Sequence, residues 1–79
     1  MLRDLPDDDE WIRAHSQVIG ARVRARREHL NVRQEAVFLA ADVDRRTLQA
    51  LEAGTGNPTL ATLMRIAYVL DMPLAELLG

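Results

Sequence analysis

The 79-residue sequence contains no cysteine and no lysine, and none of its apolar runs is long enough to cross a bilayer. Without cysteine there is no disulfide framework and no cysteine metal site, which favours a reducing compartment. A membrane-spanning helix needs about 20 mostly apolar residues. The first ten residues, MLRDLPDDDE, are acidic where an export signal is basic and then apolar. We therefore expect a cytoplasmic protein.

The groups that catalysis requires are also missing. Neither His15 nor His29 stands in a recognisable arrangement with a serine or cysteine nucleophile. The acidic run from Asp7 to Glu10 has the ligand type of a metal site but no fixed geometry, and a solvated run is the simpler interpretation. We expect no enzyme activity, no cofactor and no metal site.

Charge is distributed unevenly along the chain, although the net charge is only −2. The first twelve residues carry five acidic residues and one arginine, whereas residues 13–46 carry eight arginines and four acidic residues. All ten basic residues are arginine, which donates paired hydrogen bonds to phosphate and guanine, although GC-rich codon usage is the simpler cause. The middle of the chain is a candidate nucleic-acid-binding face.

Apolar residues recur at helical spacing and no strand pattern is present, so an all-α fold is expected. The first helix should run from Glu10 to about Leu30, either unbroken or interrupted near His15 with Ser16 capping a second piece. Asn31 can end it in a left-handed conformation. Further helices are predicted at about 33–41, at about 45–53, from a Thr59 cap to Leu70, and at 73–78 with Pro73 in the first turn.

The stretch from Gln34 to Gly54 organises this pattern as two short helices joined by a tight turn. Asp42 can end the first helix because aspartate tolerates a left-handed backbone. Asp44 can cap the second helix through its carboxylate. Long hydrogen-bonding side chains open the second helix: Arg45, Arg46 and Gln49. A helix that enters the DNA major groove needs such residues, since arginine pairs with guanine and glutamine with adenine.

A series of positions keeps its spacing without gaps: Ile19-Gly20, Arg22-Val23-Arg24, Arg27, Gln34-Glu35, Val43, Thr47-Leu48, Leu51-Glu52, Gly54, Asn57-Pro58-Thr59, Leu60, Leu63, Ile66-Ala67, Leu70, Leu74 and Glu76-Leu77-Leu78. Through this series the chain resembles the phage-repressor (Cro/XRE-type) helix-turn-helix domain. The resemblance implies a five-helix, lambda-repressor-like domain at residues 16–79. Residues 1–15 would form an acidic extension, partly disordered or helical.

The resemblance also implies a sequence-specific regulator of transcription, with repression as the expected effect, that binds double-stranded DNA in a bacterium or phage. Helix 45–53 would lie in the major groove. The implied base-reading residues are Asp44, Arg45, Arg46 and Gln49. The implied phosphate contacts are Arg33, Gln34, Thr55, Gly56, Asn57 and Thr59. Arg27 and Glu52 would form a structural ion pair between helices.

Some positions depart from the family pattern. Phe38 stands where the family usually has a small alanine, and Asp42 where it has glycine. Ala41 stands where the family has a larger apolar residue. Phe38 either fills the volume that Ala41 leaves or alters the angle between the second and third helices. Ala53, Thr55 and Gly56 occupy places that often carry lysine, arginine or asparagine, so non-specific binding should be weaker.

Several simpler interpretations remain open. The polar residues of the third helix could be a solvated face, and Arg22, Arg24 and Arg26 are expected to be solubilising charge. We expect a homodimer, although the residues predicted at its surface could also be core: Trp11, Leu74, Leu77 and Leu78. The alternative function is a protein-interaction module on the same scaffold. Such an antitoxin-like or co-regulatory subunit would have another protein as partner and weak or no direct DNA binding.

Overall fold

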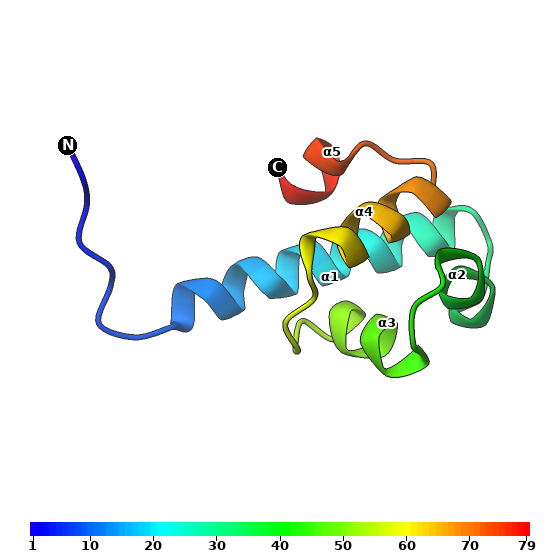
Figure 1. Cartoon of the computed structure of the whole chain (residues 1–79), viewed down its shortest axis with the longest axis horizontal. Coiled ribbons are helices and arrows are strands. Elements are labelled where there is room, and N and C mark those ends of the chain that lie inside the picture. Colours follow the sequence, from blue (N-terminus) through cyan, green and yellow to red (C-terminus); the bar gives the residue numbers. More distant parts are fainter.

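The computed structural model describes all 79 residues and contains five α-helices and no strand, which confirms the all-α prediction. The helices are α1 (Glu10–His29), α2 (Gln34–Ala41), α3 (Arg45–Glu52), α4 (Leu60–Val69) and α5 (Leu74–Leu78). Figure 1 shows α1 along the long axis of the molecule, with the other four helices gathered around its C-terminal half. None of the helices combines the length and the apolar character that crossing a membrane requires.

Helix α1 is continuous, so the unbroken alternative is confirmed. The hydroxyl of Ser16 donates to the carbonyl oxygen of Ile12 at 2.9 Å, one turn earlier, and therefore does not cap a second helix. At the N-terminus of α1 the Asp8 carboxylate accepts a hydrogen bond from the Glu10 N–H at 3.0 Å. The N-terminal half of α1 projects from the body (Figure 1), which leaves Trp11 42% exposed.

All five helices contribute to a core of nine buried apolar residues: Val23, Val37, Ala41, Leu48, Leu51, Ile66, Ala67, Leu70 and Leu77. Leu77 is fully buried, so its predicted place on a dimer surface is wrong, because α5 needs this side chain to anchor itself to the body. Leu74 is partly buried against the core, and Leu78 is 44% exposed. Only Leu78 of these three presents a largely free apolar side chain.

The helix ends follow the local sequence with two exceptions, at α3 and at α5. Pro73, predicted in the first turn of α5, precedes the helix as its N-cap. Asn31 and Asp42 have φ angles of 57° and 56°, which confirms the predicted left-handed stops. The Thr59 hydroxyl accepts a hydrogen bond from the Thr62 N–H at 3.1 Å, as predicted for the cap of α4. Asp44 makes no side-chain cap, which corrects the prediction for α3. Its N-terminus is exposed, so water can satisfy the first N–H groups instead.

Two arginines of α1 do more than solubilise the chain. Arg26 donates from Nε to the carbonyl oxygen of Leu70 at 2.9 Å and from a terminal nitrogen to that of Asp71 at 3.1 Å. Arg22 donates to the carbonyl oxygen of Leu77 at 3.2 Å. These carbonyls lie at the C-terminal ends of α4 and α5, where no backbone donor remains. The two side chains therefore tie α4 and α5 to α1.

Two glycines allow α1 and the end of α3 to approach closely. A Cβ atom at Gly20 would overlap the carbonyl oxygen of Leu51 and lie 3.1 Å from that of Glu52. Gly54 follows α3 with a φ of 76°, and a Cβ atom there would lie 2.7 Å from Cγ of Gln17. Only glycine fits both sites without displacing a neighbour. This close contact places the C-terminal end of α3 directly against α1.

Candidate nucleic-acid interface

Helix α3 has one face in the core and one in solvent. Leu48 and Leu51 are buried and anchor it. The four side chains that the sequence predicts to read bases all lie on the exposed side: Asp44, Arg45, Arg46 and Gln49. Because the helix is held only by its inner face, its outer face is free to contact a partner. The structure thus meets the geometric requirement of a reading helix.

A groove lies on each side of α3. The first, which we call the α2 groove, has a volume of about 410 Å³ and is lined by Arg27, Arg33, Gln34, Glu35, Phe38, Arg45 and Gln49. The second, the loop groove, has a volume of about 230 Å³ and is lined by Arg46, Thr47, Ala50, Thr55, Gly56, Asn57 and Pro58. Arg45 and Arg46 therefore face different grooves, and α3 forms the ridge between them.

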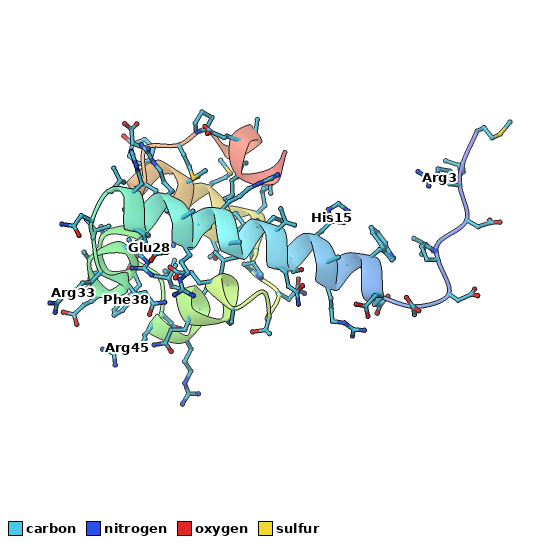
Figure 2. All side chains as sticks on the ribbon, turned by 180° about the vertical axis from the view of Figure 1, so that it is seen from behind. Arg3, His15, Glu28, Arg33, Phe38 and Arg45 are labelled. Atoms are coloured by element: carbon cyan, nitrogen blue, oxygen red, sulfur yellow. The ribbon has the colours of Figure 1, made fainter.

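The charge separation seen in the sequence persists in the fold. Figure 2 shows Arg33, Phe38 and Arg45 together at one end of the molecule, whereas Arg3 and the acidic N-terminal segment lie at the other. The molecule is 42 Å long. At physiological ionic strength charges are largely screened beyond about 8 Å, so the distant acidic segment has little effect on the arginines at α3.

Glu52, in the last turn of α3, joins three helices. Its carboxylate accepts two hydrogen bonds from Arg27 of α1, from Nε at 2.8 Å and from a terminal nitrogen at 3.0 Å. The same carboxylate accepts a hydrogen bond from Nε2 of Gln34, the first residue of α2, at 3.1 Å. Only 14% of the Arg27 side chain and 4% of that of Glu52 are exposed. This network fixes α2 and α3 relative to α1.

The Arg27 guanidinium is charged, and each of its three nitrogens donates a hydrogen bond within the protein. Its remaining terminal nitrogen donates to the carbonyl oxygen of Val32 at 3.0 Å. The hydrogen bond to Glu52 raises the pKa of Arg27 against the opposing effect of burial, and the charge of Glu52 adds to the rise. A bidentate arginine–carboxylate pair is among the strongest polar contacts in proteins. Although Arg27 lines the α2 groove, three of its five N–H groups already donate within the protein.

Gln34 lines the α2 groove, and part of its hydrogen-bonding capacity is free. Its amide nitrogen has two hydrogens, and the contact with Glu52 uses one of them. Its backbone N–H belongs to the first turn of α2, where no helical acceptor exists. Arg33, the preceding residue, is exposed and has no partner in an ion pair or hydrogen bond. These two residues bring free donors to one edge of the groove.

The residues after α3 differ in which of their hydrogen-bonding groups are free. The Thr55 hydroxyl donates to the carbonyl oxygen of Ala50 at 3.2 Å. The Thr59 hydroxyl accepts from the Thr62 N–H and donates to the Thr62 hydroxyl at 3.0 Å. Both hydroxyls therefore have intramolecular partners. Gly56 and Asn57 are exposed between them, and the N-terminus of α4 follows with free backbone N–H groups.

Three features of this region lie outside what the sequence had indicated: the Gln34–Glu52 hydrogen bond, the position of Arg45 over the Phe38 ring, and an exposed apolar stripe on α4 formed by Leu60, Met64 and Tyr68. The stripe could have been found, because these residues recur every four positions. The two contacts join different helices and leave no local signal. No group of three or more acidic or histidine side chains is placed to hold a metal ion.

Comparison with known proteins gives two findings. The family model described as Helix-turn-helix matches residues 23–77. The crystal structure of the restriction-modification controller protein C.AhdI from Aeromonas hydrophila is similar to this chain, with a TM-score of 0.77 and 28% sequence identity. That match covers 81% of this chain and 97% of the controller protein. A search of curated proteins gives no match.

Proposed function

Because this chain belongs to the helix-turn-helix family, whose members are DNA-binding regulators of transcription, we propose that α3 enters the major groove of double-stranded DNA. The observation that carries the proposal is the exposed outer face of α3 between two grooves. An α-helix fits the width of the major groove, and side chains at its N-terminal end then reach the base edges. The similarity to a controller protein supports a regulatory role.

The proposed base contacts follow from the chemistry of the four exposed residues. Arg45 and Arg46 can each donate two hydrogen bonds to a guanine, and Gln49 can pair with an adenine. Asp44, whose carboxylate caps no helix, is free to accept from a cytosine amino group. All four lie at or within the first turns of α3. Regulation would then be repression, because a protein bound in this way excludes others from the same DNA.

Phosphate contacts are proposed on both sides of the reading helix. Arg33 and Gln34 supply donors at the α2 groove, while Gly56, Asn57 and the N-terminus of α4 supply them at the loop groove. Helix N-termini favour anions because free N–H groups point outward. Thr59 would act through its backbone N–H group, since its hydroxyl already has a partner. Thr55 is the weakest of the expected phosphate contacts, because its backbone N–H and its hydroxyl both donate to the carbonyl oxygen of Ala50. Such contacts set the register of the protein on DNA.

Replacing Arg46 with alanine is expected to weaken specific DNA binding by about 5- to 150-fold, because one bidentate base contact contributes about 1–3 kcal/mol. The base preference at one position of the site should relax as well. Sites would first be selected from a randomised duplex library with the wild-type protein. Fluorescence anisotropy at two salt concentrations then gives the affinity of each variant.

Arg24→Ala is the matched control, since it removes the same charge from an exposed position on α1, where Arg24 pairs with Glu28 at 3.4 Å. Its affinity should stay close to that of the wild type. If the wild type shows no salt-sensitive binding, and Arg45→Ala and Arg46→Ala behave like it, the reading-helix proposal fails. The protein would then contact chiefly another polypeptide.

We further propose that the protein acts as a cytoplasmic homodimer, because two reading helices about 34 Å apart can bind successive turns of one DNA face. Trp11 and Leu78 are 42% and 44% exposed, and with the partly buried Leu74 they form the proposed contact surface. Figure 1 shows the end of α5 beside α1, on the side toward which the N-terminal half of α1 projects.

Sedimentation velocity at micromolar concentration should give a dimer for the wild type and a monomer for Leu78→Asp. Leu39→Asp is the control, because Leu39 lies on α2 and is 67% exposed. A wild-type monomer would contradict the dimer. If Leu78→Asp remains dimeric while Tyr68→Asp dissociates, the interface lies instead on the exposed stripe of α4, where Tyr68 is 87% exposed.

A further inference from the structure

Phe38 is the one phenylalanine of the chain, and it lies beside the reading helix. It projects from α2, is partly buried against the core, and lines the α2 groove. The guanidinium carbon of Arg45, the first residue of α3, lies 5.5 Å from the centroid of its ring. Figure 2 shows the two side chains next to each other at the end of the molecule. This distance is within the range of a cation–π contact.

The contact holds the Arg45 side chain without using its hydrogen bonds. Arg45 has no ion pair and no hydrogen bond within the protein, although Glu35 lines the same groove. A carboxylate partner would occupy the guanidinium donors, as Glu52 occupies those of Arg27. An aromatic ring instead attracts the cation through its face and leaves the N–H groups at the edge free. Arg45 is therefore restrained but still able to donate.

Arg46 provides the contrast within the same helix turn. It is exposed on the side of the loop groove, has no aromatic neighbour within cation–π distance, and has no ion pair. A free arginine loses about 2 kcal/mol of rotamer entropy when it becomes fixed, whereas a restrained one loses less. On binding DNA, Arg45 would therefore lose less side-chain entropy than Arg46.

We propose that Phe38 is a specificity-determining positioning residue, which holds the Arg45 guanidinium over its ring so that the free donors meet one base. The inference rests on the proposed major-groove function of α3. The base would be guanine, because only its O6 and N7 acceptors match the paired donors of arginine. Discrimination at that base pair should exceed discrimination at the pair read by Arg46. Phe38 itself need not touch the DNA.

The test compares binding sites selected from one randomised duplex library by the wild type, Phe38→Leu, Phe38→Tyr, Arg45→Ala and Arg46→Ala. Phe38→Leu keeps an apolar side chain in the core but removes the ring. It should reduce the guanine preference about two- to fivefold at the position that Arg45→Ala erases. The position that Arg46→Ala erases should keep its preference. Phe38→Tyr, which retains the ring, should restore the wild-type profile.

A measurement on the free wild-type protein keeps the proposal testable if Phe38→Leu does not fold. The side-chain Nε–H groups of Arg45 and Arg46 are observed by nitrogen-15 NMR. Arg45 should show a ring-current shift and a restricted Nε–H, and Arg46 should show neither. Equal mobility and no ring-current shift would overturn the proposal.

The outcomes separate this inference from the proposed function. If the wild type selects a site and Phe38→Leu selects it with an unchanged base profile, the ring serves packing alone and only this inference fails. A uniform loss of affinity across all sequences would have the same meaning, because loss of packing does not depend on the base. If the wild type selects no site, the proposed function fails together with the inference.

Discussion

Replacing Glu52 with alanine is expected to lower the free energy of unfolding by about 3 kcal/mol, because the change leaves the partly buried Arg27 charge without its carboxylate partner. The same carboxylate holds Gln34, so one substitution releases contacts to both α1 and α2. A domain of this size has a total stability of only about 5–10 kcal/mol. Urea denaturation followed by circular dichroism would measure the loss.

The matched control is Glu28→Ala, which removes an acidic residue whose ion pair with Arg24 is exposed on both sides. Exposed pairs of this kind contribute about 0.2–1 kcal/mol. A second control removes both charges through Arg27→Met with Glu52→Leu, which should recover most of the stability lost in Glu52→Ala. Equal losses for Glu28→Ala and Glu52→Ala would show that the three-helix network contributes no more than a surface pair.

The second large effect is expected for Gly20→Ala, with a loss of about 2–3 kcal/mol in the free energy of unfolding. In an ordinary helix interior the same change stabilises by about 1 kcal/mol, because alanine is the better helix former. Here the new methyl group would overlap the backbone of Leu51 and crowd that of Glu52. Backbone cannot rotate away as a side chain does, so α3 would have to move away from α1. Thermal and urea denaturation would both report the change.

Ala21→Gly is the control for Gly20→Ala, because Ala21 lies one residue further along α1 and is exposed. It should cost about 1 kcal/mol through helix propensity alone. Both exchanges would then destabilise, although they change helix propensity in opposite directions. Stabilisation by Gly20→Ala would mean that α1 and α3 do not approach as closely as the structure indicates. DNA binding by Gly20→Ala should also fall, since α3 carries the proposed reading residues.

Much of the architecture was predictable because it depends on residues close together in the chain. Asn31 and Asp42 end their helices because these residue types tolerate a left-handed backbone, and the Thr59 side chain caps the backbone three residues away. The periodicity of apolar residues likewise gave the helices to within a few positions. The predicted Asp44 cap does not form. The Asp44 carboxylate is able to accept a hydrogen bond from the first turn of α3, but at an exposed helix end water can take its place.

The roles of the individual arginines were harder to predict from the sequence. Arg22 and Arg26 were expected to be solvated charge, yet both cap carbonyls more than forty residues away. Leu77 was placed on a surface although it is buried. In each case the sequence shows a residue type that suits either environment. Whether the residue is buried or exposed depends on which helix packs against it, and that packing involves residues distant in the sequence.

The amino-acid sequence by itself determined five helices, their approximate ends and the polar outer face of α3, since periodicity, turn residues and caps act over a few neighbouring positions. Only the tertiary structure decided that Glu52 holds both Arg27 and Gln34, and that Arg45 rests over Phe38 while Arg46 stays free. These contacts join residues seven to twenty-five positions apart on different helices. They form only once the buried faces of the helices have packed together and set the distances between them.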